Sequence, residues 1–442
     1  MFDEKVERDE KDEIGEYYGQ DYIDGALVYQ SAAVSVMDAR TGFVLYENAQ
    51  HELLYPASVT KIMTALLVIE EVEDLSETVL FSDYAVLSLP YYASRMNVAV
   101  GDSMTVYEAL YGLMLPSGND VANALAEHVS GDIAAFVSRM NRRAEELGAY
   151  NTRFINACGL PGYNQHTTAY DMALIMREAI SHPLFNRIIA SPYFTVSPME
   201  SMPYGLPMRN TNRMIRPTEE YYNPAIVGGK TGFTNAAQHT LVSYARQGEH
   251  QLIVSVLYAP SRATFTDTTA LLNYAFAMPV ETIFTAANYN WEVPVIQDIE
   301  GEPSQIASLR VEAQGNLRIP IPEDMPTIRR EIYIPESVRP PVREGDVVGS
   351  KRFYAGDTLI SEVNLISAET VLPRIVAPRT RPESLTMIPP EPIFSFSPFF
   401  AIMPLLTLMF MGIILVLLRR HRRLLRRRRM ARVRYARYTS YE

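Results

Sequence analysis

The sequence predicts an α/β (α+β) protein in which helices pack on an antiparallel sheet, followed by a small all-β module and a single transmembrane helix. Three observations predict this architecture. A two-strand pattern near residue 32 precedes a series of helical patterns and two alternating strands. From about residue 278, short alternating stretches are separated by glycine and proline. Residues 393–418 carry no charged side chain.

The chain length and the distribution of charge indicate several domains, with the two ends of the chain in different surroundings. A chain of 442 residues is typical of two or three domains. The tail after Leu418 carries eleven arginines and one acidic residue, so the net charge of −11 leaves −21 for the residues before it. Residues 1–25 are acidic and show no periodicity, so we expect a solvated, disordered segment. They lack the basic start and apolar stretch of a signal peptide.

The expected catalytic domain, 26–277, begins with a hairpin and continues with helices. Strands are expected at Ala32–Val36 and Phe43–Tyr46, around the turn at Asp38–Gly42. Apolar residues at helical spacing then predict helices over Ile62–Ile69, Val106–Met114, Val121–Val129, Phe136–Leu147 and Ala169–Ile180. Alternation at Leu241–Ala245 and Leu252–Leu257 predicts antiparallel strands, and Thr268–Ala277 a closing helix.

The remaining residues predict a β module, a spacer and a membrane anchor. Residues 278–371 are expected to form the all-β domain, with strands at Ser308–Val311, Leu317–Ile321 and Arg330–Ile334. Residues 372–392 are proline-rich and predict a semi-extended spacer. The 26 uncharged residues of 393–418 exceed the roughly 20 that span a bilayer core. A buried core helix is the alternative for this stretch.

The arginines of 419–442 directly follow the span, so the positive-inside rule places the C-terminus in the cytoplasm and the preceding domains outside. A nucleic-acid-binding tail is the alternative on charge alone, but the position beside the span favours a topology signal and no nucleic-acid partner.

The predicted topology requires export of the domains that precede the span. We therefore expect an export signal upstream of the sequence given.

Three short motifs carry the chemistry: Ser58-Val59-Thr60-Lys61, Ser117-Gly118-Asn119 and Lys230-Thr231-Gly232. The chain has only five lysines against 35 arginines, and two of the five lie in these motifs. Lysine can lose its proton when buried, whereas arginine effectively cannot. A lysine that must act as a base would explain this choice, and it points to an activated serine nucleophile.

The spacing of the motifs supports that chemistry. Ser58 and Lys61 are three apart and share one face of a helix. Lys230 nearby would favour a neutral Lys61, because two adjacent positive charges are unfavourable. Glycines around Lys230 allow close backbone approach, and a strand edge there would pair with an extended substrate. Each motif alone is weak, since chance matches, polar turns and glycine-rich strand entries explain them equally well.

Together and in this order, the motifs resemble the set of penicillin-binding proteins and serine β-lactamases. Residues 56–65, 117–120, 159–160 and 228–234 further resemble the D-alanyl-D-alanine carboxypeptidase family of low-molecular-mass penicillin-binding proteins. The likeness covers about residues 26–277, and 341–349 resemble that family's C-terminal β domain. It implies the penicillin-binding-protein fold and removal of the terminal D-alanine from peptidoglycan stem peptides, with β-lactams as covalent inhibitors.

The resemblance also implies roles for individual residues. Ser58 would attack the penultimate D-alanine carbonyl and Lys61 would take its proton. Ser117 and Lys230 would pass a proton to the leaving group, and Asn119 would hold the substrate amide. The resemblance also implies that the backbone N–H groups of Ser58 and Phe233 form the oxyanion hole. The implied contacts of the terminal carboxylate are Thr231, Gly232, Thr234 and Arg262, the last of which follows the strand at Leu252–Leu257.

The chain departs from the family pattern at three points. Ala157 stands where the family usually has proline, the anchor is a full span with an arginine tail, and the export signal is absent. The single cysteine, Cys158, excludes an intrachain disulfide, and we expect a small buried residue. No cluster of His and Cys has zinc-ligand spacing, and the proposed chemistry requires no cofactor.

Other functions share parts of this pattern. A class A β-lactamase has all three motifs but needs a glutamate after Ser-x-Asn to activate water. No glutamate occurs between Leu147 and Arg177. A non-catalytic wall-peptide receptor would not need the intact catalytic set. A transpeptidase remains open, because the sequence does not distinguish water from an amine as acceptor.

Overall fold

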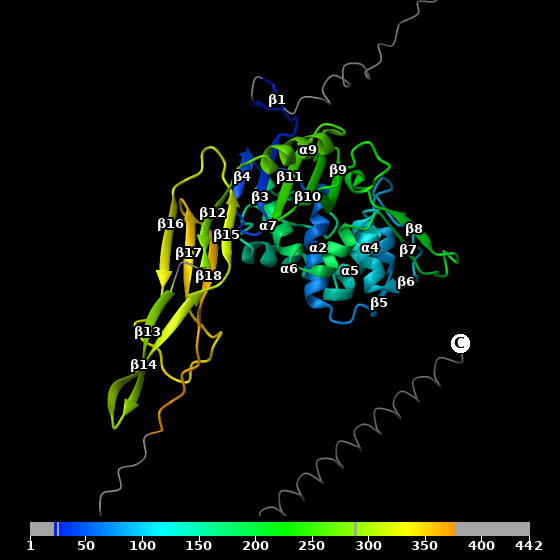
Figure 1. Cartoon of the computed structure of the whole chain (residues 1–442). Coiled ribbons are helices and arrows are strands. Elements are labelled where there is room, and N and C mark those ends of the chain that lie inside the picture. Colours follow the sequence, from blue (N-terminus) through cyan, green and yellow to red (C-terminus); the bar gives the residue numbers. More distant parts are fainter. Residues whose placement is uncertain (1–21, 24–25, 287–289, 376–442) are drawn as a thin grey trace, which may run out of the picture. The chain divides into compact units, whose positions relative to one another are not determined.

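A computed structural model describes residues 22–23, 26–286 and 290–375 (Figure 1). Its first part is a five-stranded antiparallel sheet in the order β4-β3-β11-β10-β9. The strands are β3 (Ala33–Asp38), β4 (Val44–Asn48), β9 (Ile226–Thr234), β10 (Gln238–Gln247) and β11 (His250–Ala259). Strand β9, which carries the Lys-Thr-Gly motif, lies at one edge. The other strand bounds are β1 (Tyr22–Ile23), β2 (Ala26–Leu27), β5 (Thr78–Leu80), β6 (Ser103–Thr105), β7 (Tyr193–Val196) and β8 (Leu206–Arg209).

The helices cover both faces of this sheet, with α9 on one side and α2 and α7 on the other (Figure 1). Their bounds are α2 (Lys61–Glu71), α3 (Asp83–Leu87), α4 (Val106–Met114), α5 (Asn119–Ser130), α6 (Ile133–Glu146), α7 (Ala169–Ala179), α8 (Pro183–Ile189) and α9 (Ala263–Phe276), with 3-10 turns η2 (Ala57–Thr60) and η3 (Arg213–Ile215).

Alternating side chains explain why the central strands are apolar throughout. In β11, Leu252, Val254 and Val256 join the core beneath α9. The intervening Ile253 and Leu257 join the core formed with α2 and α7. Because successive strand residues point to opposite faces, a sheet covered on both sides needs apolar residues on both.

The predicted helices and strands of this part all occur, with shifted ends. The largest shift is in α9, which begins at Ala263 rather than at the predicted Thr268. Its first turns contain Thr264, Asp267 and Thr268, all of which are buried. The Asp267 carboxylate accepts the backbone N–H of Ser31 at 2.8 Å. A tertiary hydrogen bond therefore satisfies a polar residue that interrupts the apolar pattern in the sequence.

Within the described residues, seven strands follow α9. Five form an antiparallel sheet in the order β13-β14-β18-β17-β16, and two form the pair β12-β15. Their bounds are β12 (Val280–Thr285), β13 (Asn290–Ile299), β14 (Glu302–Ala313), β15 (Asn316–Pro320), β16 (Ile328–Tyr333), β17 (Val347–Ala355) and β18 (Thr358–Ser367). The three strands expected here correspond to β14, β15 and β16. Strands β12, β13, β17 and β18 had no clear signal, because their polar and apolar residues are mixed.

Residues 22–23 pair with β2, so strand structure begins just before the predicted boundary at 26. None of the helices within the described ranges is long and apolar enough to cross a membrane. The predicted span at 393–418, the arginine-rich tail 419–442, residues 376–392 of the spacer and nearly all of the acidic segment lie outside the described residues.

Candidate active site

Ser58 lies in the 3-10 turn η2, which continues directly into α2. This continuity places Lys61 one turn after Ser58, as the spacing predicts. The Lys61 Nζ lies 3.1 Å from the Ser58 Oγ. The serine is half-buried, whereas the lysine is completely buried. A nucleophile and a candidate base are therefore within hydrogen-bond reach.

Lys61 is held by two further acceptors. Its Nζ donates to the Asn119 Oδ1 at 2.5 Å and to the Cys158 carbonyl oxygen at 2.8 Å. Burial lowers the pKa of Lys61 to about 8, and the electrostatic influence of Cys158 and Asp120 opposes part of this shift. At pH 7 about a tenth of Lys61 is therefore neutral and able to accept a proton, far more than for an exposed lysine.

The Ser117-Gly118-Asn119 motif forms the turn into α5. Ser117 has a left-handed backbone with φ of 65°, and Asn119 is the first residue of the helix. The neighbouring Asp120 carboxylate accepts the backbone N–H of Met96 at 2.9 Å, which fixes the turn to an adjacent loop. The Ser117 Oγ is buried and has no hydrogen-bond partner among the described residues. Such a group at a pocket wall is available to a substrate.

The third motif lies on the edge strand β9. Lys230 is completely buried, and its Nζ donates to the Thr231 carbonyl at 2.8 Å. Burial, together with the charge of Lys61, holds the pKa of Lys230 well below its usual range. Gly232 passes so close to η2 that a Cβ there would lie 2.8 Å from the Ser58 nitrogen. The glycine therefore allows this strand to approach the nucleophile.

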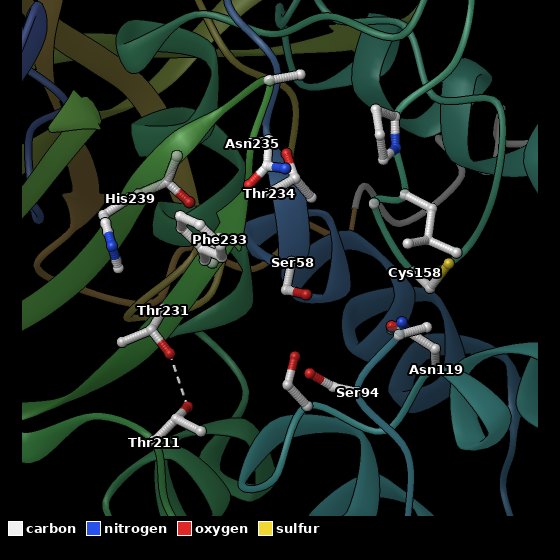
Figure 2. Close-up of a pocket in the computed structure, with 18 of the residues that line it drawn as sticks. Ser58, Ser94, Asn119, Cys158, Thr211, Thr231, Phe233, Thr234, Asn235 and His239 are labelled. Atoms are coloured by element: carbon white, nitrogen blue, oxygen red, sulfur yellow. Dashed lines mark hydrogen bonds between the residues drawn. The ribbon is translucent and has the colours of Figure 1, made fainter. Parts of the chain in front are cut away.

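These three segments surround a pocket of about 660 Å³ (Figure 2). Of the residues predicted from sequence, Ser58, Ser117, Asn119, Thr231, Gly232, Phe233 and Thr234 line it. Lys61 and Lys230 lie buried behind its surface. Arg262 is exposed at the N-terminal end of α9 and is not among the lining residues.

The pocket also contains residues that the sequence did not single out. Among them are Ser94, Thr211, Arg213 and His239. The Cys158 carbonyl reaches Lys61 because the Asn156 Oδ1 accepts the N–H of Gly159 at 2.7 Å and so fixes the turn. A Cβ at Gly159 would lie 1.8 Å from the Ala57 carbonyl oxygen. Burial raises the pKa of the Cys158 thiol, in keeping with the small buried residue expected.

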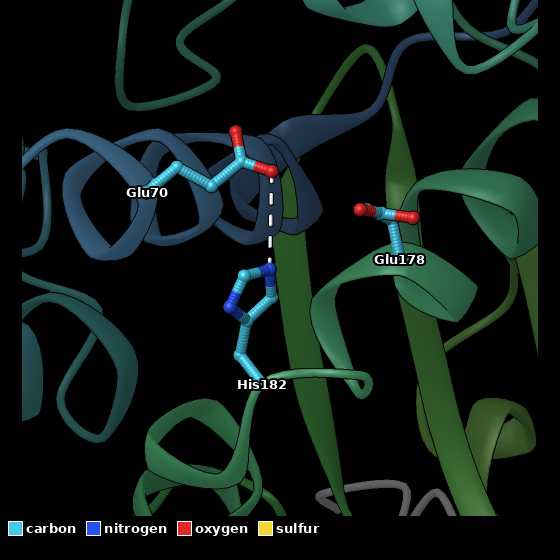
Figure 3. A group of neighbouring side chains, drawn as sticks. All are labelled: Glu70, Glu178 and His182. Carbon is cyan, nitrogen blue, oxygen red and sulfur yellow. Dashed lines mark ion pairs between the residues drawn. The ribbon is translucent and has the colours of Figure 1, made fainter. Parts of the chain in front are cut away.

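One group of side chains has the spacing of a metal site. Glu70, Glu178 and His182 bring potential ligand atoms within 4.8 Å of one another (Figure 3). Arg143 donates to Glu70 at 2.7 Å and to Glu178 at 2.9 Å, so one guanidinium bridges the two carboxylates. We interpret the group as an ion-pair cluster that joins α2, α6 and α7.

A serine hydrogen-bonded to a buried lysine, beside Ser-x-Asn and an edge-strand Lys-Thr-Gly, defines the active site of a penicillin-binding serine hydrolase. Residues 24–261 match the family described as D-alanyl-D-alanine carboxypeptidase (Peptidase_S11). This chain belongs to that family, which confirms the resemblance seen in the motifs.

Two individual proteins are also similar to this chain. The chain is 30% identical over 329 residues to the D-alanyl-D-alanine carboxypeptidase DacF of Bacillus subtilis, covering 73% of this chain and 81% of that protein. The DD-transpeptidase of Streptomyces K15, solved as a point mutant, is 30% identical with a TM-score of 0.53, covering 57% of this chain and all of that one.

A third comparison extends over the β strands. The peptidoglycan synthesis regulatory factor PBP3 of Streptococcus pneumoniae has a TM-score of 0.67 at 24% identity, covering 78% of this chain and 100% of that one. At this identity the likeness shows the fold. The penicillin-binding-protein fold with a C-terminal β domain is thus confirmed.

Proposed function

We propose that Ser58 carries the acyl group in a reaction that removes the terminal D-alanine from peptidoglycan stem peptides. The observation that supports this most directly is the 3.1 Å contact between the Ser58 Oγ and the buried Lys61 Nζ. Neutral Lys61 takes the hydroxyl proton as Oγ attacks the penultimate D-alanine carbonyl. The C–N bond to the terminal D-alanine then breaks, and an ester on Ser58 remains.

The other polar groups complete the step. The leaving amine needs a proton, which Ser117 supplies with Lys230 behind it. The backbone N–H groups of Ser58 and Phe233 stabilise the oxyanion, and Asn119 orients the substrate amide. Thr231 and Thr234 bind at the carboxylate end of the substrate. Water then hydrolyses the ester and restores Ser58.

A β-lactam would follow the same first step, because its ring carbonyl replaces the scissile amide. We expect a long-lived adduct rather than rapid hydrolysis. No acidic residue lines the pocket in the described part of the chain, so no carboxylate stands ready to activate water as in class A β-lactamases. Glu178, the first glutamate after Leu147, is paired with Arg143 instead.

We propose further that residues 393–418 anchor the enzyme in the membrane, with the catalytic domain outside the cytoplasm and residues 419–442 inside. The β strands after residue 277 and the spacer 372–392 would hold the active site away from the bilayer, toward its polymeric substrate. A membrane anchor suits an enzyme whose substrate is insoluble and lies beside the membrane.

Product analysis tests the proposal. The full chain is incubated with a diacyl-Lys-D-Ala-D-Ala peptide, with and without excess glycine as amine acceptor, and products are separated by mass spectrometry. A carboxypeptidase gives free D-alanine and the shortened peptide under both conditions. A product that appears only with glycine, as its adduct, would instead identify a transpeptidase, and no product would favour a receptor.

A further inference from the structure

The pocket contains one guanidinium that the proposed reaction does not use. Arg213 lines the pocket together with Thr211 and Thr231. Figure 2 shows Thr211 and Thr231 side by side, with their hydroxyl oxygens 2.7 Å apart. Arg213 therefore belongs to the same wall as the threonine of the Lys-Thr-Gly motif.

The segment before Arg213 explains why it faces the pocket. Asn210 and Asn212 are buried, whereas Thr211 is exposed and Arg213 is half-buried. This alternation places Thr211 and Arg213 on one side of the segment. The Asn210 Oδ1 accepts the N–H of Asn212 at 2.9 Å, and the Asn212 Oδ1 accepts the N–H of Met214 at 3.0 Å. The backbone that presents Arg213 is therefore fixed by its own buried amides.

Contacts with Glu219 and Tyr221 orient the Arg213 guanidinium. Its Nε donates to the Glu219 carboxylate at 2.6 Å, and its plane lies over the Tyr221 ring at 4.7 Å from the centroid. Within the described residues, neither terminal nitrogen of Arg213 has a hydrogen-bond partner. The side chain is thus oriented, with its two terminal NH₂ groups still available for a ligand.

The charge of the side chains around Arg213 is positive overall. Glu219 is the shared partner of three arginines, Arg209, Arg213 and Arg216. One carboxylate among three guanidinium groups leaves two positive charges in excess. Arg216 is 5% exposed, and its Nε has no partner among the described residues. The three arginines share this single carboxylate, so the cluster carries a net positive charge that attracts a negatively charged ligand.

We propose that Arg213 binds the C-terminal carboxylate of the substrate and thereby restricts the enzyme to free chain ends. Two terminal NH₂ groups match a carboxylate in a bidentate geometry, beside the hydroxyls of Thr211 and Thr231. An internal peptide bond would leave the two terminal NH₂ groups of Arg213 without an anionic partner from the substrate. The inference rests on the proposed function and assigns to Arg213 the carboxylate contact that the family resemblance implies for Arg262.

A pair of inhibitors tests this without relying on turnover. The second-order rates of Ser58 acylation are measured for benzylpenicillin and for its methyl ester, which lacks the negative charge but has the same reactive ring. We expect Arg213→Ala in the full chain to reduce the preference for the free acid about 10–100-fold, the range of a charged hydrogen-bonded pair, with little change for the ester. Arg213→Lys should retain part of the preference.

Arg209→Ala is the matched control. Arg209 pairs with the same Glu219, but its side chain is 57% exposed and does not line the pocket, so its loss should change the acid-to-ester ratio much less than the loss of Arg213 does. Thermal melting of each variant shows whether it folds. If Arg213→Ala does not fold, the acid-to-ester ratio is measured for Arg213→Gln instead, because this variant keeps a polar side chain but removes the charge.

If folded Arg213→Ala or Arg213→Gln keeps the wild-type acid-to-ester ratio, the inference is overturned. This holds whether or not Arg262→Ala changes the ratio. The two proposals fail differently. A wild-type enzyme that is acylated by penicillin but releases no D-alanine would contradict the proposed function, while the inhibitor pair would still test Arg213. With an active enzyme, the two substrates compared are a D-Ala-D-Ala acid, which releases D-alanine, and its C-terminal amide, which releases D-alaninamide. The ratio of their turnover rates should fall in the same variants.

Discussion

Two lysine side chains placed away from water determine the chemistry at the scale of single residues. Lys61 and Lys230 are both completely buried, although lysine is among the residues least often found inside proteins. Burial favours the neutral amine in both, which a base requires and a structural ion pair does not. In the proposed mechanism, this energetically unfavourable placement supplies a base near neutral pH.

Replacing Lys61 by arginine should abolish acylation although the positive charge is retained. A guanidinium is not deprotonated at any accessible pH, so it cannot take the Ser58 proton. Knockouts of comparable catalytic groups reduce kcat by about 10⁴–10⁶. Stopped-flow acylation with a chromogenic β-lactam gives the rate, and melting curves verify the fold. A rate near that of the wild type would refute Lys61 as the base.

The same assignment fixes the direction of the pH profile. Below its pKa of about 8, Lys61 is mostly protonated and inactive as a base. We therefore expect acylation to increase with rising pH, about 50-fold between pH 6 and pH 8, and to level off above about pH 9. Acylation rates measured across this range provide the test. A profile already flat between pH 6 and pH 8 would mean that Lys61 is neutral throughout or is not the base.

Residues of the site were predictable only where a motif marks them. Ser58, Lys61, Ser117, Asn119 and Lys230 occur in recognisable triplets and quartets. The Cys158 acceptor is a backbone carbonyl, which any residue type supplies, so no sequence signal identifies it. Arg213 is one of 35 arginines, and it differs from the others in lining the pocket, which only the folded chain brings together.

At the scale of elements, the approach of β9 to η2 brings the motifs together. A glycine is required at position 232 for space rather than for its backbone angles. A Cβ there would lie 2.5 Å from the Thr240 Oγ1 as well as against the Ser58 nitrogen. The strand and the turn would have to separate, which displaces the donors proposed to form the oxyanion hole.

Gly232→Ala should therefore reduce β-lactam acylation by about 10²–10³, the effect of losing one oxyanion donor. Gly248→Ala in the β10–β11 hairpin is the control. Its φ of 62° also favours glycine, but no atom lies within 4 Å of the added Cβ. It should lower the melting temperature slightly and leave the acylation rate unchanged. Equal effects of the two variants on acylation would argue against a specific role for the β9–η2 approach.

Element prediction succeeded where one kind of periodicity dominates. Helix α4 begins and ends as the apolar spacing indicates, because a capping box of Thr105 and Glu108 fixes its start. Short elements such as α3 and β7 contain too few residues for a pattern to emerge. In α9, buried threonines and Asp267 interrupt the pattern, and only contacts with distant residues such as Ser31 make them compatible with a helix.

For the whole molecule, the sequence predicts that the enzyme is anchored in a membrane. The charge of −21 before the tail and the eleven arginines within it are separated by the uncharged residues 393–418. Hydropathy and charge alone lead to this prediction, because the bilayer acts on composition rather than on tertiary contacts. The juxtaposition of β9, η2 and α5, in contrast, depends on the complete fold and is not encoded in any local pattern.

A chain ending at Ile375 should lose membrane attachment but keep its active site. We expect the full chain to sediment with membranes after cell fractionation and the shortened chain to remain in the supernatant. Both should be acylated by labelled penicillin at similar rates, since every pocket residue precedes Ile375. Membrane sedimentation of the shortened chain to the same extent would contradict an anchor within 393–418.

The most direct test of the central claim is D-alanine release from a diacyl-Lys-D-Ala-D-Ala peptide by the full chain and by its Ser58→Ala variant. The wild type should release D-alanine, and the variant, while melting at a similar temperature, should lose at least about 10⁴-fold of the rate. Release that persists in Ser58→Ala would show that another group carries the reaction and would contradict the assignment of Ser58 as the nucleophile.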